Sequence, residues 1–400
     1  MFNKKESNKK IVAYLRDFKK MDFAKDVFLI PYYIAKEKKM PMTLYYGVNK
    51  GDIEIPILYR DVQIISCGHK SISDIKEFLD ALWYLIPKVN QIDTLFVVGI
   101  SFLHMLRVWI IKHINPNINI ILFGDIEPKT AEDLKDNGIP SKNIISKQIK
   151  NKFANYFFRN TICLVANPLS YKYMKDLYIK KKWKGLLHFW PCIDDETTNS
   201  LNISRPRLNQ KEKIILYVGR IGNYQKNTEM LLEALPKVDL KDWYIYMIGP
   251  ITSDFTIGHK CEFNTIIEDF FKNNPHYVGK ILFNGVIYNT EELFNFYKRA
   301  KVFILTSRHE SFGNVLSEAA AMGCYIVSTD VGGASLVSNN WKYGTKLKQE
   351  DSDNLANVIN EIINERIEIN ECNMMPFDDL CYSNNTRKII IPSLYYEKNS

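Results

Sequence analysis

Two glutamates with seven residues between them, Glu310 and Glu318, are the side chains of this sequence best placed to hold a polar ligand. The apolar run Val302–Ser307 predicts a buried strand, and Val315–Met322 predicts a helix. Glu310 then lies in the loop between this strand and this helix, and Glu318 lies in the helix, about one helical turn after its start. Because carboxylates accept paired hydrogen bonds from sugar hydroxyls, we expect Glu310 to hold a sugar and Glu318 to reach a ribose. The alternative is a helix-capping glutamate followed by a solvated one.

The turn between the two glutamates has the composition of an anion site. Gly313 permits a tight turn and a close approach of a ligand to the backbone. The amides of residues 312–315 are expected at or just before the helix N-terminus, where unpaired N–H groups and the helix dipole favour negative charge. We therefore expect these amides to cradle a phosphate, and Ser311, Phe312, Gly313 and Asn314 to belong to the same ligand site.

A second pair of candidates carries positive charge. Arg220 follows the apolar run Ile214–Val218, and Lys226 stands just before Asn227, a predicted N-cap. Ligands of open α/β sheets bind beyond the carboxyl ends of strands, and an arginine there offers a planar donor fork suited to a diphosphate. Two fixed cations would also stabilise a diphosphate as a leaving group. The alternative is two ordinary surface cations.

The elements that must position these residues are predicted from short apolar runs that alternate with amphipathic ones, a pattern typical of a doubly wound α/β fold. In the C-terminal half the predicted strands are Ile214–Val218, Trp243–Ile248, Ile281–Phe283, Val302–Thr306 and Cys324–Ser328. The predicted helices are Thr228–Leu235, Phe263–Lys272, Glu291–Ala300, Val315–Met322 and Asn354–Ile363, the last with Asp353 as its N-cap.

The N-terminal half shows the same alternation of predicted strands and helices, but its apolar runs are less regular. Its predicted strands are Val27–Ile30, Val62–Ile65, Thr94–Val98, Ile118–Phe123 and Thr161–Val165, and its predicted helices are Ile75–Leu85, Phe102–Ile114 and Leu169–Ile179. The polar region Pro191–Lys213 is the predicted linker. We expect a first domain over 1–200, a second over 201–379, and residues 380–400 packing back on the first.

Composition limits the function further. With 46% hydrophobic and 24% charged residues the chain is globular, and no apolar run is long enough to predict a membrane span. No apolar segment follows the basic N-terminus as a signal peptide would require. Seven cysteines without a Cys-x-x-Cys or Cys/His cluster indicate a reducing, cytoplasmic compartment and no metal site. The acidic pairs Asp194-Asp195 and Asp378-Asp379 are interpreted as loop carboxylates.

The formal charge of +8 leaves two interpretations open. Lysines cluster at 4, 5, 9, 10, 19 and 20 and again at 172, 175, 180, 181, 182 and 184. They are either solvated helix faces or contacts to an anionic surface, such as the inner face of the plasma membrane or a lipid-phosphate acceptor. Nucleic acid is not expected, because no recognised binding module accompanies the charge.

Three segments, in order, resemble the donor-binding half of GT-B glycosyltransferases, in particular the retaining family usually called GT4. They are ILYVGRIGNYQKNTEMLLEAL at 215–235, NGVIYNTEELFNFYKRAKVFILTSRHESFG at 284–313 and NVLSEAAAMGCYIVSTDVGGASLV at 314–337. The resemblance covers about a third of the chain clearly and extends faintly through the N-terminal half. It implies two Rossmann-like domains that face each other across a cleft.

The resemblance also implies roles for single residues. Arg220 and Lys226 would bind the donor diphosphate, Glu310 the donor sugar and Glu318 the ribose, with the nucleobase near Val286, Ile287 and Tyr288. Such enzymes stabilise the leaving group with cations and helix amides, so no metal or other cofactor is implied.

The N-terminal half departs from the family's pattern. Many members have a glycine-rich loop after their first strand, whereas Leu29–Met42, taken here as that loop, has none. Many also place a histidine at the end of a middle strand, where Ile121–Asp125 ends in an aspartate. Asp125 is therefore the candidate catalytic residue of this half, the alternative being a turn or cap aspartate before Pro128. His104 and His309 are interpreted as structural.

These features predict transfer of a hexosyl group from a nucleoside diphosphate sugar to an acceptor hydroxyl in surface polysaccharide or glycan synthesis, and the resemblance implies retention of the anomeric configuration. The donor is expected to be UDP-linked, and the acceptor to be a glycan or a lipid-linked or protein-linked sugar. Two alternatives stay open: a sugar-nucleotide epimerase of the same architecture, and a non-catalytic subunit attached to a membrane.

Overall fold

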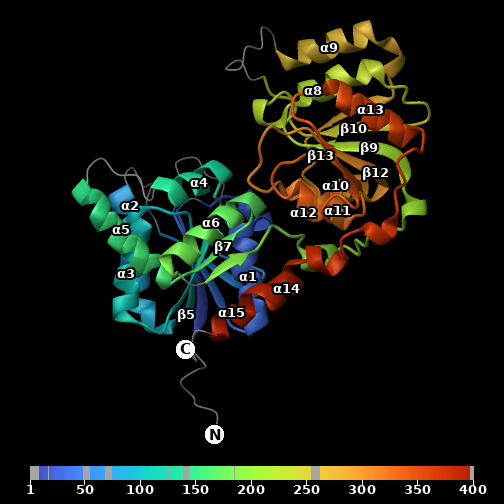
Figure 1. Cartoon of the computed structure of the whole chain (residues 1–400). Coiled ribbons are helices and arrows are strands. Elements are labelled where there is room, and N and C mark those ends of the chain that lie inside the picture. Colours follow the sequence, from blue (N-terminus) through green and yellow to red (C-terminus); the bar gives the residue numbers. More distant parts are fainter. Residues whose placement is uncertain are drawn as a thin grey trace. The chain divides into compact units, whose positions relative to one another are not determined.

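The chain folds into two α/β units, shown by the computed structural model in Figure 1. The structure describes residues 9–16, 18–47, 55–67, 74–124, 126–137, 144–183, 185–253 and 262–396. One unit comprises Met1–Pro191 with Tyr382–Ser400, and the other comprises Cys192–Cys381. The division thus falls at the first residue of the predicted linker, and residues 192–200 belong to the second unit, not to the first.

The first unit is built on a sheet with strand order β3-β4-β2-β1-β5-β6-β7-β8 among its described residues. Every neighbouring pair is parallel except β3 and β4. The strands are β1 (Lys10–Leu15), β2 (Met42–Tyr46), β3 (Leu58–Tyr59), β4 (Val62–Ser66), β5 (Ile92–Val98), β6 (Asn119–Gly124), β7 (Ile162–Val165) and β8 (Leu186–His188). Parallel strands need long crossovers, and helices supply most of them.

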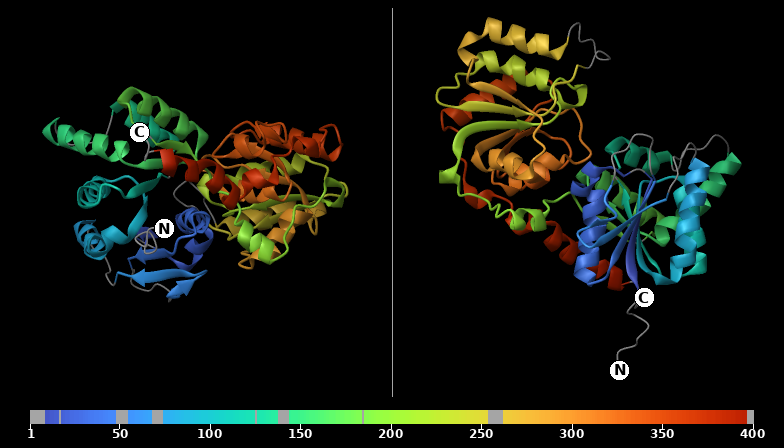
Figure 2. Two further views of the ribbon diagram at one scale, coloured as in Figure 1. Left: turned by 90° about the horizontal axis from the view of Figure 1, so that it is seen from below. Right: turned by 180° about the vertical axis from the view of Figure 1, so that it is seen from behind.

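Helices cover both faces of this sheet, as the right-hand view of Figure 2 shows. One layer contributes to the core that contains Val12, Leu95 and Leu122. Its helices are α2 (Asp74–Leu85), α3 (Phe102–Ile114), α4 (Pro128–Asn137), α5 (Ile144–Arg159) and α6 (Pro168–Lys181). The opposite layer contains α1 (Asp26–Lys38) with two short C-terminal helices, α14 (Tyr382–Asn385) and α15 (Ile391–Tyr396). No described helix has both the length and the apolar character to cross a bilayer.

The strand predicted at Val27–Ile30 is wrong, because these residues lie in helix α1. The segment from Phe28 to Ala35 is buried without interruption, since the sheet covers one side of the helix and the C-terminal segment covers the other. A helix buried all round has the same continuous apolar run as a buried strand. The stretch Leu29–Met42 is accordingly not the loop after the first strand. That strand, β1, ends at Leu15.

The C-terminal segment is attached to α1 by specific contacts. The ring of Tyr382 stacks on Tyr33 with centroids 5.6 Å apart, and its hydroxyl donates a hydrogen bond to Asp26. Arg387 donates through Nη2 and Nε to the Glu37 carboxylate at 2.8 and 3.0 Å. These contacts explain why the last residues of the chain belong to the first unit.

The second unit has an all-parallel sheet with strand order β11-β10-β9-β12-β13-β14. Its strands are β9 (Glu212–Val218), β10 (Tyr244–Ile248), β11 (Ile281–Gly285), β12 (Ala300–Leu305), β13 (Tyr325–Thr329) and β14 (Gly344–Leu347). Its helices are α7 (Asp195–Ser200), α8 (Thr228–Ala234), α9 (Phe263–Asn273), α10 (Thr290–Arg299), α11 (Asn314–Ala321), α12 (Ala334–Val337) and α13 (Ser352–Ile363). Two parallel-sheet α/β domains are the predicted fold class, which is confirmed.

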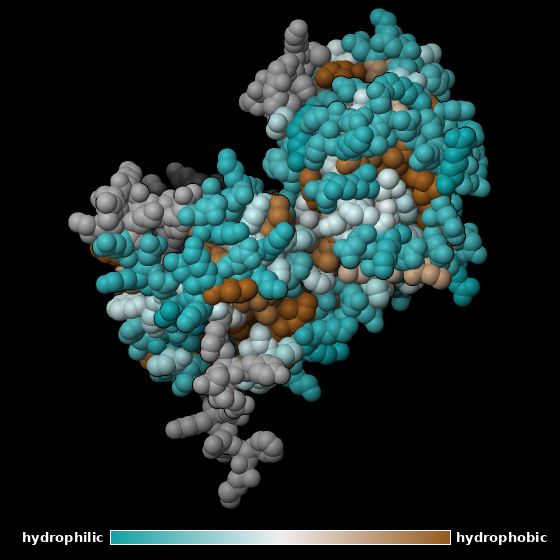
Figure 3. All heavy atoms as spheres, viewed as in Figure 1, coloured by the Kyte–Doolittle hydropathy of each residue, from teal (hydrophilic) through white to brown (hydrophobic). Residues whose placement is uncertain are grey.

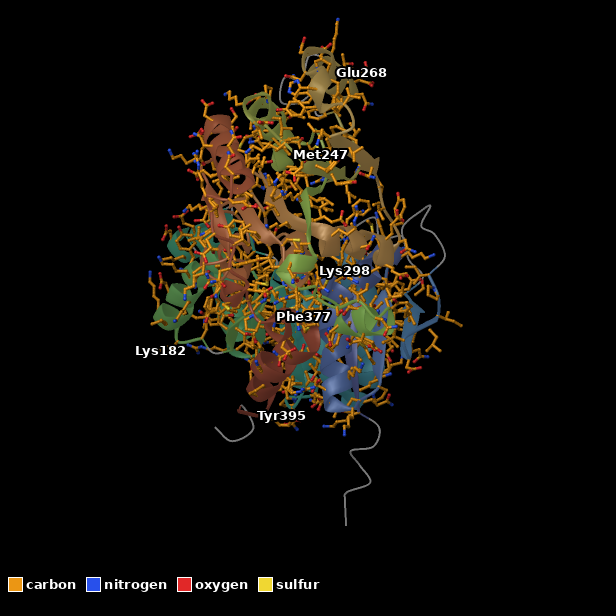
Figure 4. The ribbon with its side chains drawn as sticks, turned by 90° about the vertical axis from the view of Figure 1, so that its right-hand side faces the viewer. Lys182, Met247, Glu268, Lys298, Phe377 and Tyr395 are labelled. Atoms are coloured by element: carbon orange, nitrogen blue, oxygen red, sulfur yellow. The ribbon has the colours of Figure 1, made fainter. Side chains whose placement is uncertain are left out.

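Side-chain placement in the second unit follows the pattern of its strands and helices. Met247 of β10 is buried in the core, while Lys298 lies near the end of α10 (Figure 4). The surface in Figure 3 is mostly hydrophilic, as expected when the apolar residues gather between sheet and helices. One predicted cap is wrong: Asp351, not Asp353, caps α13, and its carboxylate accepts a hydrogen bond from the Asn354 amide at 2.8 Å.

The stack of Tyr382 on Tyr33 predicts that the C-terminal segment stabilises the first unit. We expect Tyr382→Ala to lower the free energy of unfolding by roughly 3 kcal/mol, because a buried ring and its hydrogen bond are lost. Calorimetry or urea unfolding of the full chain measures the change. Tyr395→Ala, on the same segment but exposed, is the matched control and should change stability by less than about 0.5 kcal/mol. Equal effects of the two substitutions would contradict the assignment.

Candidate functional site

The predicted site residues follow two strands that are neighbours in the sheet of the second unit. Strand β9 precedes Arg220 and Lys226, and strand β12 precedes Glu310. The strand order runs outward from β9 through β10 to β11 and from β12 through β13 to β14. The order therefore reverses between β9 and β12, and in open α/β sheets ligands bind outside the carboxyl ends of the strands at such a point.

A buried ion pair joins the two loops. Lys226 Nζ lies 2.5 Å from Glu310 Oε1, and the side chains are 13% and 7% exposed. Ser307 donates its hydroxyl to the same carboxylate oxygen at 2.7 Å. Removing one partner would leave a desolvated charge, so the two side chains hold each other in place.

Gln225 connects Arg220 to this pair. Arg220 Nη2 donates to Gln225 Oε1 at 2.8 Å, and Gln225 Nε2 donates to Glu310 Oε2 at 3.3 Å and to the His309 carbonyl at 3.0 Å. Arg220 is exposed, so its remaining donor groups are accessible from solvent. Three of the four predicted ligand-binding side chains thus belong to one hydrogen-bonded network.

The loop that carries Arg220 is fixed by close backbone packing. The amides of Gly219 and Ile221 donate to the carbonyls of Ile248 and Pro250, both at 2.9 Å. A Cβ atom on Gly249 would lie 1.9 Å from the Gly219 carbonyl oxygen, so only glycine allows this approach. The two loops after β9 and β10 consequently form one rigid layer of backbone.

Helix α11 begins beside this layer of loops. Gly313 is its N-cap, and the Leu316 amide donates to the Gly313 carbonyl at 2.9 Å. The amides before Leu316 have no partner within the helix, as at any helix N-terminus. Phe312 is buried against Gly332 and Gly333, and a Cβ atom on Gly332 would lie 2.1 Å from the Phe312 carbonyl oxygen. The loop after β13 therefore fixes the turn that precedes the helix.

Glu318 hydrogen bonds to another element. Its Oε2 accepts a hydrogen bond from the Tyr297 hydroxyl of α10 at 2.7 Å. Burial raises the pKa of Glu318, and the hydrogen bond from Tyr297 opposes that shift because it stabilises the charged form. The hydrogen bond of Glu318 thus goes to Tyr297 and not to the Lys226–Glu310 pair.

The remaining predicted donor contacts lie at the start of α11 and in the loop after β11 of the same unit. Ser311 is partly buried and Asn314 is exposed, on either side of the α11 N-cap. Ile287 is partly buried in the loop after β11, next to Tyr288, which is 91% exposed. An exposed aromatic ring at the carboxyl end of a strand offers a face on which a planar base could stack.

Asp125 and His104 are the candidate residues of the first unit, and His309 is a further histidine in the second. Asp125 lies outside the described residues. His104, near the start of α3, is 3.0 Å through Nδ1 from the Gly99 carbonyl, and burial followed by the charge of Arg107 lowers its pKa. A Nδ1–H that donates to a carbonyl leaves Nε2 as the basic nitrogen of a neutral ring. His309, in the second unit, contributes its backbone carbonyl to Gln225.

The acidic pairs and the lysine cluster take ordinary positions. Asp194 precedes α7 and accepts a hydrogen bond from Thr197 at 2.5 Å, and Asp195 is the first residue of that helix. Asp378 and Asp379 lie in the 3₁₀ helix Phe377–Leu380, so the interpretation as loop carboxylates is wrong for Asp195 and for this second pair. No group of three or more potential metal ligands occurs among the described residues. The described lysines of the second cluster, Lys172, Lys175, Lys180, Lys181 and Lys182, are exposed along and just after α6, with Lys182 at the periphery of the first unit (Figure 4).

Sequence reasoning missed three residues of this site: Gln225, Ser307 and Tyr297. Gln225 is adjacent to Lys226, and Ser307 stands three residues before Glu310 at the end of a predicted strand. Their closeness in sequence to predicted site residues is the signal that could have identified both. Tyr297 had no such signal, because its contact with Glu318 depends on how α10 packs beside α11.

Comparison with known proteins places part of the chain in a described family. Residues 200–375 match the family described as glycosyl transferases group 1. An uncharacterized glycosyltransferase of Methanocaldococcus jannaschii is 28% identical over 157 residues, which cover 38% of this chain and 36% of the relative. The capsular polysaccharide biosynthesis glycosyltransferase CapM of Staphylococcus aureus is 26% identical over 170 residues, 42% of this chain and 41% of the relative. These matches span well under two thirds of the relatives' own lengths.

Solved structures match over nearly the whole chain. The lipopolysaccharide outer core galactosyltransferase WaaB, in its apo form, has a TM-score of 0.65 at 13% identity, covering 97% of this chain and 99% of its own. The Anabaena protein HepE in complex with UDP has a TM-score of 0.57 at 13% identity, covering 97% and 98%. Residues 200–375 therefore form a domain of the glycosyl transferases group 1 family, and the chain as a whole has the GT-B fold of glycosyltransferases.

Proposed function

We propose that the protein transfers a hexosyl group from a nucleoside diphosphate sugar to an acceptor hydroxyl, with retention of the anomeric configuration. The observation that carries this proposal is the Lys226–Glu310 pair, linked through Gln225 to Arg220 at the point where the strand order reverses. Two cations and the N-terminus of α11 suit a diphosphate. The carboxylate beside them suits the hydroxyls of the attached sugar.

The ion pair also indicates how a donor would enter. In the structure, the Lys226 ammonium is paired with the Glu310 carboxylate. A donor phosphate offers the ammonium a second anion, and this releases carboxylate hydrogen-bonding capacity for the sugar. As the glycosidic bond breaks, negative charge grows on the diphosphate, where Lys226 and Arg220 stabilise it. We propose attack from the same face of the sugar, with the departing phosphate accepting the acceptor proton and no metal taking part.

The donor in this proposal is UDP-linked, and the acceptor is a glycan or a lipid-linked or protein-linked sugar in polysaccharide synthesis. Structures of HepE contain UDP, UDP and glucose, or UDP-glucose, which supports the choice of base. The names of CapM and WaaB support the choice of pathway class. We further propose that the protein works in the cytoplasm and contacts the anionic inner face of the plasma membrane.

Nucleotide sugars test the donor site directly. Calorimetry with a panel of UDP-, GDP- and ADP-sugars should give tightest binding for a UDP-sugar, with slow donor hydrolysis in EDTA. Lys226→Ala should weaken binding by about 10- to 100-fold, because it removes a charge-assisted contact to phosphate. Lys237→Ala removes an exposed lysine paired with Asp353 and is the matched control. The proposal fails if no donor binds, or if Lys226→Ala and the control behave alike.

Glu310 is expected to act on the sugar and not on the diphosphate. Glu310→Gln should lower turnover at least about 100-fold, because the amide is uncharged and offers only one acceptor oxygen. Affinity for free UDP should change by less than about threefold. Turnover measured with UDP-sugar and titration with UDP alone separate the two effects. A variant that lost UDP binding and turnover in equal measure would place Glu310 at the phosphates instead.

The raised pKa of Glu318 predicts that removing its charge increases thermal stability at neutral pH while weakening donor binding. A carboxyl whose folded pKa lies above its unfolded value binds its proton more tightly when folded, so its contribution to stability falls as pH rises through that interval. Glu318→Gln should therefore unfold at a higher temperature than the parent at pH 7, with the difference vanishing below about pH 4. It should also bind UDP-sugar more weakly if the carboxylate holds the ribose. Thermal unfolding between pH 4 and 8 and donor titration measure both.

The same reactions distinguish transfer from epimerisation. With donor but no acceptor, an epimerase would accumulate the epimerised nucleotide sugar, whereas a transferase yields only UDP and free sugar. NMR of the sugar products reads out the difference. Accumulated epimer would replace the proposal of transfer with that of an isomerase.

A further inference from the structure

The segment 224–227, which carries Lys226, is too short to fix its own position. It is a single 3₁₀ turn, Tyr224–Lys226, followed by Asn227, whose backbone is left-handed with a φ of 47°. A turn of this length has few internal hydrogen bonds, and a residue other than glycine at positive φ costs energy. Neighbouring residues must therefore hold the segment, and they decide where the Lys226 ammonium lies.

Two residues just after β12, Thr306 and Arg308, contact every backbone carbonyl of this segment. The Arg308 guanidinium donates through Nη1 to the Tyr224 carbonyl at 2.6 Å, and the Arg308 amide donates to the Gln225 carbonyl at 2.8 Å. The Thr306 hydroxyl lies 3.0 and 2.9 Å from the carbonyls of the last two residues. The segment is thus attached to the loop after β12 along its whole length.

Glu350 holds Arg308 from a third loop, the turn between β14 and α13. Its carboxylate accepts hydrogen bonds from Arg308 Nε at 2.6 Å, from Arg308 Nη2 at 3.0 Å and from the Asn227 side-chain amide at 3.2 Å. Glu350 has a φ of 53°, and such strained residues persist where surrounding contacts compensate for the cost. The two left-handed residues, Asn227 and Glu350, are therefore joined through one hydrogen-bonded network with Arg308.

We propose that Arg308 and Glu350 are positioning residues of the donor site, because together they hold the segment 224–227 where Lys226 meets Glu310. They act through the Lys226 ammonium, so the inference rests on the proposed role of that ammonium at the donor phosphate. A misplacement of about 1 Å at a site can cost roughly 100-fold in rate. The Glu350 side chain is 55% exposed, so the pair adds little to stability and its main effect is on position.

The second unit contains a matched pair elsewhere. Arg299 donates to the Glu212 carboxylate through Nε at 2.7 Å and through Nη2 at 2.9 Å, and the Glu212 side chain is 50% exposed. Glu212 is the first residue of β9, so this pair lies at the edge of the sheet opposite the loops that carry the site. Removal of either glutamate breaks a two-pronged ion pair of similar exposure, and only the location differs.

Titration with UDP compares the two pairs in the full-length protein. We expect Glu350→Ala to weaken UDP binding by about 5- to 20-fold, because the Lys226 ammonium is displaced, and Glu212→Ala to weaken it by less than about twofold. Arg308→Lys keeps the charge but not the planar fork, so it should weaken binding as much as Glu350→Ala does. Thermal unfolding midpoints of the two glutamate variants should lie within about 2 °C of the parent.

A double-mutant cycle separates positioning from direct contact with the nucleotide. In the Lys226→Ala background, Glu350→Ala should weaken UDP binding by less than about twofold further, because the residue through which it acts is gone. If Glu350 acted independently of Lys226, the two losses would multiply.

Hydrogen exchange without nucleotide tests the contacts themselves. The amides of Lys226 and Asn227 donate to the Asn223 carbonyl at 3.0 and 3.2 Å. Peptides that contain these amides should exchange at least about fivefold faster in Glu350→Ala than in the parent, because local opening becomes easier. The same peptides should exchange at the parent's rate in Glu212→Ala.

The inference is overturned if Glu350→Ala binds UDP as the parent does, or if Glu212→Ala weakens binding equally. Multiplied losses in the cycle, or unchanged exchange of the segment 224–227, would overturn it as well. A parent that binds no nucleotide would instead refute the proposed donor site, and the exchange measurement would still decide whether Arg308 and Glu350 hold the segment.

Discussion

The contact between Lys226 and Glu310 is the interaction on which the site depends, because it joins residues 84 positions apart in the sequence across the point where the strand order reverses. Each charge is desolvated, and each would be costly without the other. The pair therefore fixes the loops after β9 and β12 relative to each other. Gln225 extends the network to Arg220, and Ser307 completes the hydrogen bonding of the carboxylate.

Backbone packing supplies the stiffness that side chains alone would not give. Gly249 lets the loop after β10 lie against Gly219, and Gly332 lets the loop after β13 lie against Phe312. Both contacts stand at carboxyl ends of strands, where irregular backbone would otherwise be free to move. A site held in this way needs little reorganisation when a ligand binds, which is the condition for strong electrostatic stabilisation of a leaving group.

The first unit uses its helices differently on its two faces. Helix α1 is buried between the sheet and the C-terminal segment, and the stack of Tyr382 on Tyr33 closes that face. On the other face, α2 pairs its inward Glu77 with Arg107 and leaves Leu79 and Trp83 exposed. Helix α1 is thus apolar all round because the rest of the first unit covers it.

The sequence alone determined five of the six strands described in the second unit and most of its helices, because these features depend on neighbours within a few residues. The grouping of Arg220, Lys226 and Glu310 was predicted from the resemblance of their motifs to those of a known family, since the residues lie far apart in the sequence. Only the tertiary structure decided that Val27–Ile30 is helical, that Glu318 contacts Tyr297, and that Leu79 and Trp83 of α2 are left exposed by the described residues. An apolar run indicates that a segment is buried or bound, but it does not identify the residues or the partner that cover the segment. The covering partner comes from distant parts of the chain, so its identity is a property of the packed fold.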